Sequence, residues 1–394
     1  MTTLSFGRSG RWPAEWLRAP AWRRIAPAGP TPLDDPAAAM AAALEDPLEF
    51  PPLKRAVISG DRVAVAVAPG VPQARELIAG LLSVLAEANV PPEDVTICHA
   101  QDRPPLTGPA GGLLERAHQM VHRPEDPSGL AYLAASAAAR PIYFPRVVCD
   151  ADVVIPLGWR LPAPAHRPDA QIDALFPTFS DAATQRRLRE RDTGMREGTS
   201  VPPDRPAALD EAEEAAWLLG VQFAVEIVPG PRGSVLQVVA GDREAVRRES
   251  SRLCRSVWTQ TVDRPVPAVV ATVAHADRQA TWGDVVEVIA RLEPLVEAEG
   301  AVVICTDLAE TPEESDVARL SPYLGTPEDP RATDAARRIY LVSELPDAVV
   351  ESLGLIPVAA SDELARLVRQ LGGGLVVEHA DQMVLEPTPA SSIG

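Results

Sequence analysis

The stretch Arg62–Ala100 constrains the fold of this chain more than any other. It contains an apolar, β-branched run at residues 62–68, an amphipathic helical pattern at residues 73–88 and a second apolar run at residues 94–100. A helix that joins two strands returns the chain to the same end of the sheet, so the two strands run parallel. The sequence therefore predicts an α/β fold with mainly parallel sheets.

The same alternation restarts in the second half of the chain. A strand is expected at residues 268–274 and a helix at 281–299, where Thr281 and Asp284 have the spacing of a capping box. A chain of 394 residues is long enough to build two cores. We therefore expect two α/β domains with an interdomain cleft, divided into an N-terminal arm packing on the first domain (1–60), a first domain (61–264), a second domain (265–387) and a disordered tail (388–394).

The charge balance of the chain disfavours several classes of partner. Its 37 lysine and arginine residues stand against 55 aspartate and glutamate residues, which gives a net charge of −18. Such a surface repels phosphate backbones and anionic lipid, so we expect neither a nucleic-acid nor a membrane partner. No apolar run reaches the roughly 18 residues of a membrane-spanning helix, and the N-terminus lacks the apolar segment of a signal peptide. A cytoplasmic location is expected, while oligomeric state and protein partners stay open.

Side chains that tether cofactors are scarce. Lys54 is the only lysine of the chain, so any chemistry that needs a side-chain amine must use it. The four cysteines are scattered singly without C-x-x-C spacing, which predicts reduced, buried thiols rather than disulfides or a zinc site. These cysteines are Cys98, Cys149, Cys254 and Cys305.

Two histidines have a spacing that deserves a metal hypothesis. Residues 113–120 are expected to form a helix, in which His118 and His122 would stand four residues apart on one face. No third ligand is placed by the sequence, and a histidine hydrogen-bonded to backbone at a helix end explains the pattern better. We therefore predict no metal site.

Eight phrases, in this order along the chain, resemble the nickel-dependent lactate racemase family. They are LSFGRSG, LDDPAAAMAAALEDPLEFPPL, GDRVAVAVA, VHRPEDP, CDADVVIPLG, ALDEAEEAAWLLGVQFAVEIV, VVAGDREAV and LGLIPVAASDELARLVRQLGGG. The resemblance implies two α/β domains that bind a 2-hydroxy acid in the cleft between them. It also implies a nickel pincer nucleotide joined to a lysine, two histidine acid/base groups, and arginine and lysine for the substrate carboxylate.

The residues that the resemblance would assign to catalysis are largely replaced. Residues 69–72 are PGVP where the family has Asp-x-Thr-Arg, and Asp102 stands in place of a catalytic histidine, although Arg103 after it is kept. Thr184 stands where the cofactor-bearing lysine is expected, and residues 284–290 contain no lysine. We therefore predict that the nickel cofactor and the racemase activity are absent. We also predict that a small anionic metabolite binds in the cleft and that Arg103 is one of the residues that bind it.

An enzyme of altered chemistry on a 2-hydroxy acid is the alternative. Asp102, His166 and His275 follow predicted strands and could serve as acid/base groups, with Arg103 as the anchor for an anion. Asp102 and Arg103 could equally neutralise each other, and His166 could be an exposed loop residue. Ser180, at a helix start, could bind an anion through backbone N–H groups or only cap the helix.

Overall fold

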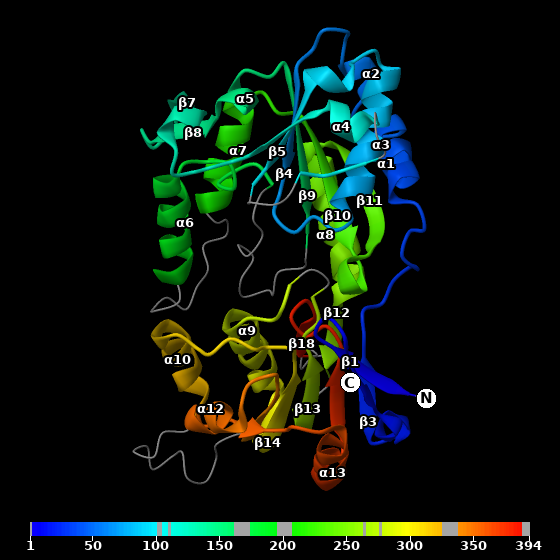
Figure 1. Ribbon diagram of the computed structural model, residues 1–394, viewed down its shortest axis with the longest axis vertical. Helices are drawn as coiled ribbons and strands as arrows, with labels where there is room; N and C mark the ends of the chain where they lie inside the picture. The colour runs from blue at the N-terminus through cyan, green and yellow to red at the C-terminus, as the bar shows by residue number, and fades with distance from the viewer. Residues whose placement is uncertain are drawn as a thin grey trace, which may run out of the picture. The chain divides into compact units, whose positions relative to one another are not determined.

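The computed structural model describes most of the chain as two compact units. The large unit comprises residues 30–230 and 234–255, and the small unit comprises residues 1–29, 231–233 and 256–394. Each unit has its own parallel sheet and core (Figure 1). The residues described are 2–100, 105–108, 112–160, 174–194, 207–262, 265–275, 278–324 and 338–387.

The large unit is built on a six-stranded sheet in the order β11-β10-β9-β4-β5-β6. All neighbouring pairs are parallel except the β10–β11 hairpin. The central strand β4 is buried at every position, which explains its uninterrupted apolar sequence. The strands are β4 (Val63–Val67), β5 (Val95–His99), β6 (His118–Val121), β9 (Val153–Trp159), β10 (Phe223–Pro229) and β11 (Val235–Asp242).

Helices and a hairpin complete the large unit. α1 packs on α3 on one side of the sheet, where Met40, Leu77 and Leu81 are buried together, and a second cluster holds Phe144 and Phe179. The helices are α1 (Pro36–Glu45), α2 (Leu53–Ala56), α3 (Ala74–Glu87), α4 (Leu113–Arg116), α5 (Arg146–Cys149), α6 (Ala182–Gly194), α7 (Ala207–Leu218) and α8 (Arg243–Trp258), and the hairpin is β7 (Leu130–Ala135) with β8 (Pro141–Pro145). The 3₁₀ turns are η2 (Pro92–Asp94) and η3 (Pro127–Gly129).

The small unit has a fully parallel six-stranded sheet in the order β16-β15-β14-β13-β17-β3. Its strands are β3 (Trp22–Ile25), β13 (Val266–Thr272), β14 (Val296–Cys305), β15 (Arg338–Val342), β16 (Ile356–Pro357) and β17 (Gly374–Val377). Two strand pairs lie beside it, β1 (Thr3–Phe6) with β2 (Gly10–Pro13) and β12 (Thr259–Val262) with β18 (Val384–Pro387). Its helices are α9 (Trp282–Leu292), α10 (Glu314–Leu320), α12 (Asp347–Ser352) and α13 (Ser361–Leu371), with 3₁₀ turns η1 (Glu15–Arg18), η4 (Pro231–Gly233), η5 (Glu293–Leu295) and η6 (Ser321–Tyr323).

The N-terminal segment corrects one expectation. Residues 1–60 do not pack as one arm on the first domain, because β3 pairs with β17 and adds the last strand to the small-unit sheet. This pairing satisfies backbone groups that β17 would otherwise expose at a sheet edge. Only from residue 30 onward does the segment belong to the large unit, and the last change of unit along the chain falls between Arg255 and Ser256.

Several local expectations are confirmed, but two expected helices end early. The helix expected at 281–299 ends at Leu292, because strand β14 begins at Val296. The α/β class with mainly parallel sheets is confirmed, and Thr281 and Asp284 form the expected capping box of α9. The four cysteines are free, and Cys98, Cys254 and Cys305 are buried. The helix expected at 113–120 ends at Arg116, because the following residues pair as β6 with β5. No helix in the described part of the chain is long and apolar enough to cross a membrane.

Gly80 provides a test of the α1–α3 contact. A Cβ atom at Gly80 would lie 2.3 Å from the backbone oxygen of Ala37, so Gly80→Ala must push α1 away from α3. We expect a loss of about 1–3 kcal/mol in the free energy of unfolding, measured by urea denaturation. Gly283 in α9 is the matched control, because its Cβ would meet nothing closer than 3.4 Å. Gly283→Ala should be neutral or stabilising, and equal effects at the two positions would contradict this packing.

Candidate functional site

Each unit has one place where the strand order reverses. In the small unit β14, β15 and β16 extend from one side of β13, whereas β17 and β3 lie on its other side. In the large unit β5 and β6 lie on one side of β4 and β9 and β10 on the other. Open α/β sheets bind ligands outside the carboxyl ends of the strands that flank such a reversal. The loops after β13 and β17, and those after β4 and β9, are therefore the candidate sites.

Three of the candidate residues lie outside the described part of the chain. They are Asp102, Arg103 and His166, and β5, which precedes the first two, ends at His99. His275 and Ser180 are described, and they belong to different units. His275 follows the carboxyl end of β13, as the sequence predicts.

Ser180 uses its donors within the large unit. Its hydroxyl and its backbone N–H both donate to the carbonyl oxygen of Pro177, at 2.7 and 2.9 Å, and the side chain is fully buried. The first turn of α6 is capped instead by Asp181, whose carboxylate accepts the N–H groups of Ala183 and Thr184, each at 3.0 Å. Neither the anion-binding nor the capping interpretation of Ser180 matches this geometry.

The residues of the large unit do not fit a lysine-tethered nickel pincer nucleotide. Thr184, at the position the resemblance assigns to the tether, donates its hydroxyl to Asp181 at 2.7 Å and offers no amine. Lys54 lies on α2, where its ammonium group pairs with Glu45 at 3.3 Å. No group of three or more histidine, cysteine, aspartate or glutamate side chains in the described residues is placed to hold a metal ion.

The histidine pair expected on a helix is also rearranged. His118 begins the strand β6 and His122 follows it, so the two do not share the face of a helix. His122 is buried, and its Nε2 donates to the carbonyl oxygen of Ser180 at 2.9 Å. Burial lowers the pKa of His122 more than this hydrogen bond raises it. The backbone-bonded interpretation of His122 is confirmed, although at a strand end.

An aromatic side chain packs between the ends of β4 and β9, where the strand order of the large unit reverses. The indole Nε1 of Trp159, the last residue of β9, donates to the carbonyl oxygen of Pro69 after β4 at 2.7 Å. Gly70 adopts a φ of +71°, and a Cβ there would lie 3.3 Å from the Trp159 ring. The segment that replaces the Asp-x-Thr-Arg phrase is therefore packed against tryptophan and presents no charge.

A cavity of about 820 Å³ in the large unit contains a buried ion pair. Arg160 donates from Nε to Glu226 at 2.7 Å, and Ser250 also donates to this carboxylate. Burial favours the protonated carboxyl, but the charge and hydrogen bonds of Arg160 outweigh it and lower the pKa of Glu226. The pair stays ionised and neutralises itself.

His275 lies between two carboxylates at the strand reversal of the small unit. Its Nε2 is 3.4 Å from Oδ2 of Asp284 in α9, and its Nδ1 is 3.8 Å from Oδ2 of Asp381, four residues after β17. Only 13% of the His275 side chain and 6% of the Asp381 side chain are exposed. The loops after β13 and β17 thus bring an imidazole and a carboxyl group together.

The two carboxyl groups differ in their electrostatics. Burial opposes ionisation of Asp284, but the hydrogen bonds from Arg278 and Thr281 and the neighbouring His275 hold its pKa well below the ordinary value. Arg278 binds it through two nitrogens at 2.7 and 2.8 Å. Neither carboxylate oxygen of Asp381 has a hydrogen-bond partner in the described residues, and burial raises its pKa to about 6 despite the opposing effect of His275. Asp284 is therefore ionised at neutral pH, whereas the raised pKa of Asp381 lets that group change charge near neutral pH.

Sequence reasoning found His275 and the capping role of Asp284 but missed Asp381. A signal was present, because Asp381 follows the apolar run at 374–377, as expected for a residue at the carboxyl end of a strand. Its neighbour His379 is buried against Trp258, with ring centroids 6.2 Å apart, and burial lowers its pKa. The site therefore contains one histidine beside carboxylates and a second one buried against a tryptophan.

Comparison with known proteins places this architecture. Residues 18–159 match the lactate racemase N-terminal domain family. The structure resembles that of the lactate racemase apoprotein from Thermoanaerobacterium thermosaccharolyticum with a TM-score of 0.70 and 14% identity, covering 98% of this chain and 99% of that one. A crystal structure of a protein from Thermotoga maritima is similar with a TM-score of 0.59 and 12% identity, covering 92% of this chain and 100% of that one.

No curated protein sequence matches the chain significantly. The matched region 18–159 begins just before β3 and ends with β9 of the large unit, so it includes the N-terminal strand that pairs with β17 of the small unit. The matched region also includes residues 69–72 and Trp159, which contact each other where the strand order of the large unit reverses. Residues 18–159 of the chain are therefore similar to the lactate racemase N-terminal domain, and the chain shares its fold with the lactate racemase apoprotein.

Proposed function

We propose that this lactate racemase-like protein has lost nickel-pincer-dependent racemisation and binds a small anionic metabolite at the carboxyl ends of its parallel strands. The observation that carries the proposal is the single lysine. Lys54 lies on α2, outside the loops that follow the strands, and is held by Glu45. The resemblance implies a lysine that bears the cofactor, and the residue at that position, Thr184, is bonded to Asp181. Without the tether the hydride acceptor has no attachment.

The anionic nature of the ligand follows from the arginine that is kept. Arg103 matches the family phrase after the second strand, and it follows β5, which ends at His99. A guanidinium at the end of a strand binds a carboxylate or a phosphate in a planar, two-pronged geometry. Since the PGVP segment after β4 carries no charge, Arg103 is the cation that the resemblance leaves to the large unit.

An enzyme of altered chemistry remains the second candidate, and the His275–Asp381 pair favours it. A buried carboxyl group whose pKa lies near 6 beside an imidazole can take up or release a proton at neutral pH. Asp102 and His166 would supply further acid/base groups, and Arg103 would anchor the substrate. A 2-hydroxy acid is the substrate class that the family resemblance suggests.

Intact mass tests the loss of the cofactor. Protein purified from cells grown with added nickel should have the mass of its sequence and contain no stoichiometric nickel, because no amine is available at residue 184. Mass spectrometry of the intact chain and elemental analysis give the two readings. Lys54→Arg is the control, since an adduct that disappears in this variant would identify Lys54 as an unexpected tether and overturn the proposal.

Arg103→Ala tests the anion site. Replacement of a guanidinium that binds a carboxylate should remove about 1.5–3 kcal/mol of binding free energy and weaken lactate binding roughly tenfold to a hundredfold. Equilibrium dialysis with radiolabelled D- and L-lactate measures it, and the melting temperature should stay unchanged. A large fall in melting temperature with retained binding would instead show that Arg103 serves in a structural ion pair.

Asp381→Asn tests the acid/base pair through stability. The folded pKa of about 6 exceeds the ordinary value of about 3.9, so the contribution of Asp381 to stability is complete below about pH 4 and is lost as the pH rises to about 6. Asparagine cannot ionise, so the variant should gain up to about 3 kcal/mol over the native protein between pH 4 and pH 7. Urea denaturation across this range measures the difference.

Asp284→Asn is the matched control for that experiment. The lowered pKa of Asp284 gives stability that is present above about pH 4 and is lost as the pH falls, so this variant should be less stable than the native protein at pH 7 and approach it in acid. A gap between native protein and Asp381→Asn that does not change with pH would show that Asp381 does not titrate in this range.

A further inference from the structure

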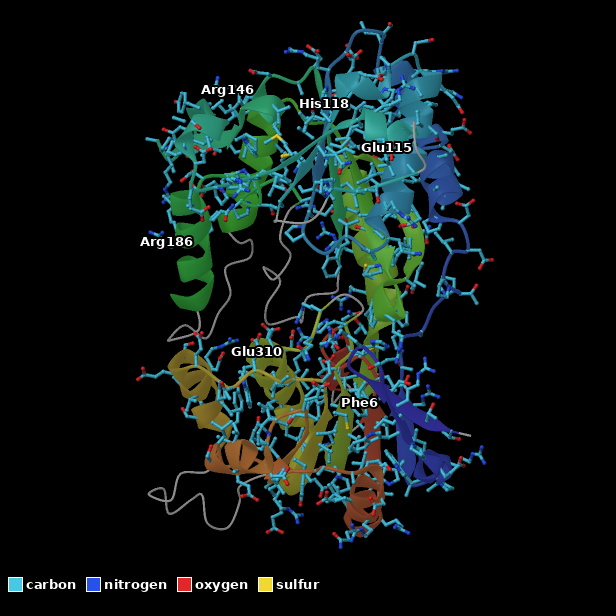
Figure 2. All side chains as sticks on the ribbon, viewed as in Figure 1. Phe6, Glu115, His118, Arg146, Arg186 and Glu310 are labelled. Atoms are coloured by element: carbon cyan, nitrogen blue, oxygen red, sulfur yellow. The ribbon has the colours of Figure 1, made fainter. Side chains whose placement is uncertain are left out.

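The turn between β1 and β2 reaches the carboxyl end of the small-unit sheet. The backbone N–H of Gly7 donates to the carbonyl oxygen of Val273, the residue after β13, at 2.7 Å. Phe6, which precedes the turn, is labelled in Figure 2. The LSFGRSG phrase, to which no site was assigned from sequence, therefore contributes a loop to the end of the sheet at which ligands of α/β proteins bind.

Two glycines are required by the close packing of this turn. Gly7 has a φ of +55°, and a Cβ there would lie 2.5 Å from the Cβ atom of Asp307. A Cβ on Gly10 would lie 2.7 Å from the backbone oxygen and ring of Phe6. A side chain at either position would displace the turn. The two glycines therefore allow the backbone of Arg8 to lie against Asp307.

Asp307 orients Arg8. Asp307 follows the carboxyl end of β14, and the Asp307 side chain is 9% exposed. Its carboxylate accepts the backbone N–H and the Nε of Arg8, at 3.0 and 3.2 Å, and the N–H of Ala280 at 3.0 Å. Burial opposes ionisation, but these hydrogen bonds outweigh it and lower the pKa of Asp307. The carboxylate is thus a fixed anchor that the three donors already satisfy.

The outer end of the Arg8 guanidinium is open. The Nε of Arg8 donates to Asp307, and 49% of the Arg8 side chain is exposed. The other two guanidinium nitrogens, Nη1 and Nη2, have no hydrogen-bond partner in the described residues. Arg24, an arginine of the same unit, differs because Glu378 accepts from two of its nitrogens. The two terminal nitrogens of Arg8 form the end-on face with which arginine grips an oxyanion.

We propose that Arg8 binds an oxyanion of the carboxylate or phosphate class at the carboxyl ends of β13 and β14. Arg8 lies in the turn that contains Gly7 and Gly10, and Asp307 holds its guanidinium in place. This inference rests on the proposed binding of a small anion and concerns a site in the small unit alone. Asp307 keeps the guanidinium in one orientation before the anion arrives, so little conformational freedom is lost on binding. Arginine suits this role because it keeps its charge at every physiological pH.

Equilibrium dialysis of the full chain tests the proposal, with radiolabelled L-lactate as the carboxylate probe and inorganic phosphate as the phosphate probe. Arg8→Ala should raise the dissociation constant of the probe that binds about tenfold to a hundredfold. Arg8→Lys, which keeps the charge but not the planar fork, should give an intermediate value. Arg11→Ala is the matched control, an exposed arginine in the same hairpin, and should bind as the native protein does.

The outcomes separate this inference from the proposed function. Binding that is unchanged in Arg8→Ala but weakened in Arg103→Ala overturns the inference alone. A native protein that binds neither probe overturns both, and so does binding that survives both substitutions. Melting temperatures identify unfolded variants, and Arg8→Gln, which keeps a polar side chain of similar length without the charge, replaces Arg8→Ala if that variant does not fold.

Discussion

Parallel strands buried on both faces are the constraint on which both units depend. Such strands carry apolar residues at nearly every position, and the central strands β4 and β13 contain no ionisable group. Polar chemistry is therefore pushed to the loops at the strand ends. In the small unit His275, Asp307 and Asp381 each follow a different strand by only a few residues, and the parallel arrangement brings them to one edge.

Local patterns were enough to predict the elements that depend on neighbours in sequence. The apolar run at 62–68, the capping box at Thr281 and the strand end before His275 are such features. Features that depend on distant pairing could not be predicted. Nothing local to residues 22–25 says that β3 pairs with β17, and the helical pattern at 113–120 gives way because β5 offers an open edge to β6.

The candidate site divides in the same way. The position of His275 follows from its own strand, but its surroundings come from α9 and from the loop after β17, which lie 9 and 106 residues further along the chain at Asp284 and Asp381. Ser180 shows the converse. A helix start suggests free N–H groups, but the N–H of Ser180 donates to Pro177 and those of Ala183 and Thr184 donate to Asp181. Residue type and spacing locate a group, and tertiary contacts decide whether its donors are available.

The near absence of lysine limits the chemistry of this scaffold. Of 37 basic residues one is Lys54, which leaves 36 arginines. Arginine keeps its proton under all physiological conditions, so it holds anions but neither exchanges protons nor forms covalent links to a cofactor. The arginines of this chain act in this way, since Arg160, Arg278 and Arg8 each form an ion pair with a carboxylate. In the small unit, the candidate groups for exchanging a proton at neutral pH are therefore histidines and carboxyl groups whose pKa burial has raised, such as Asp381.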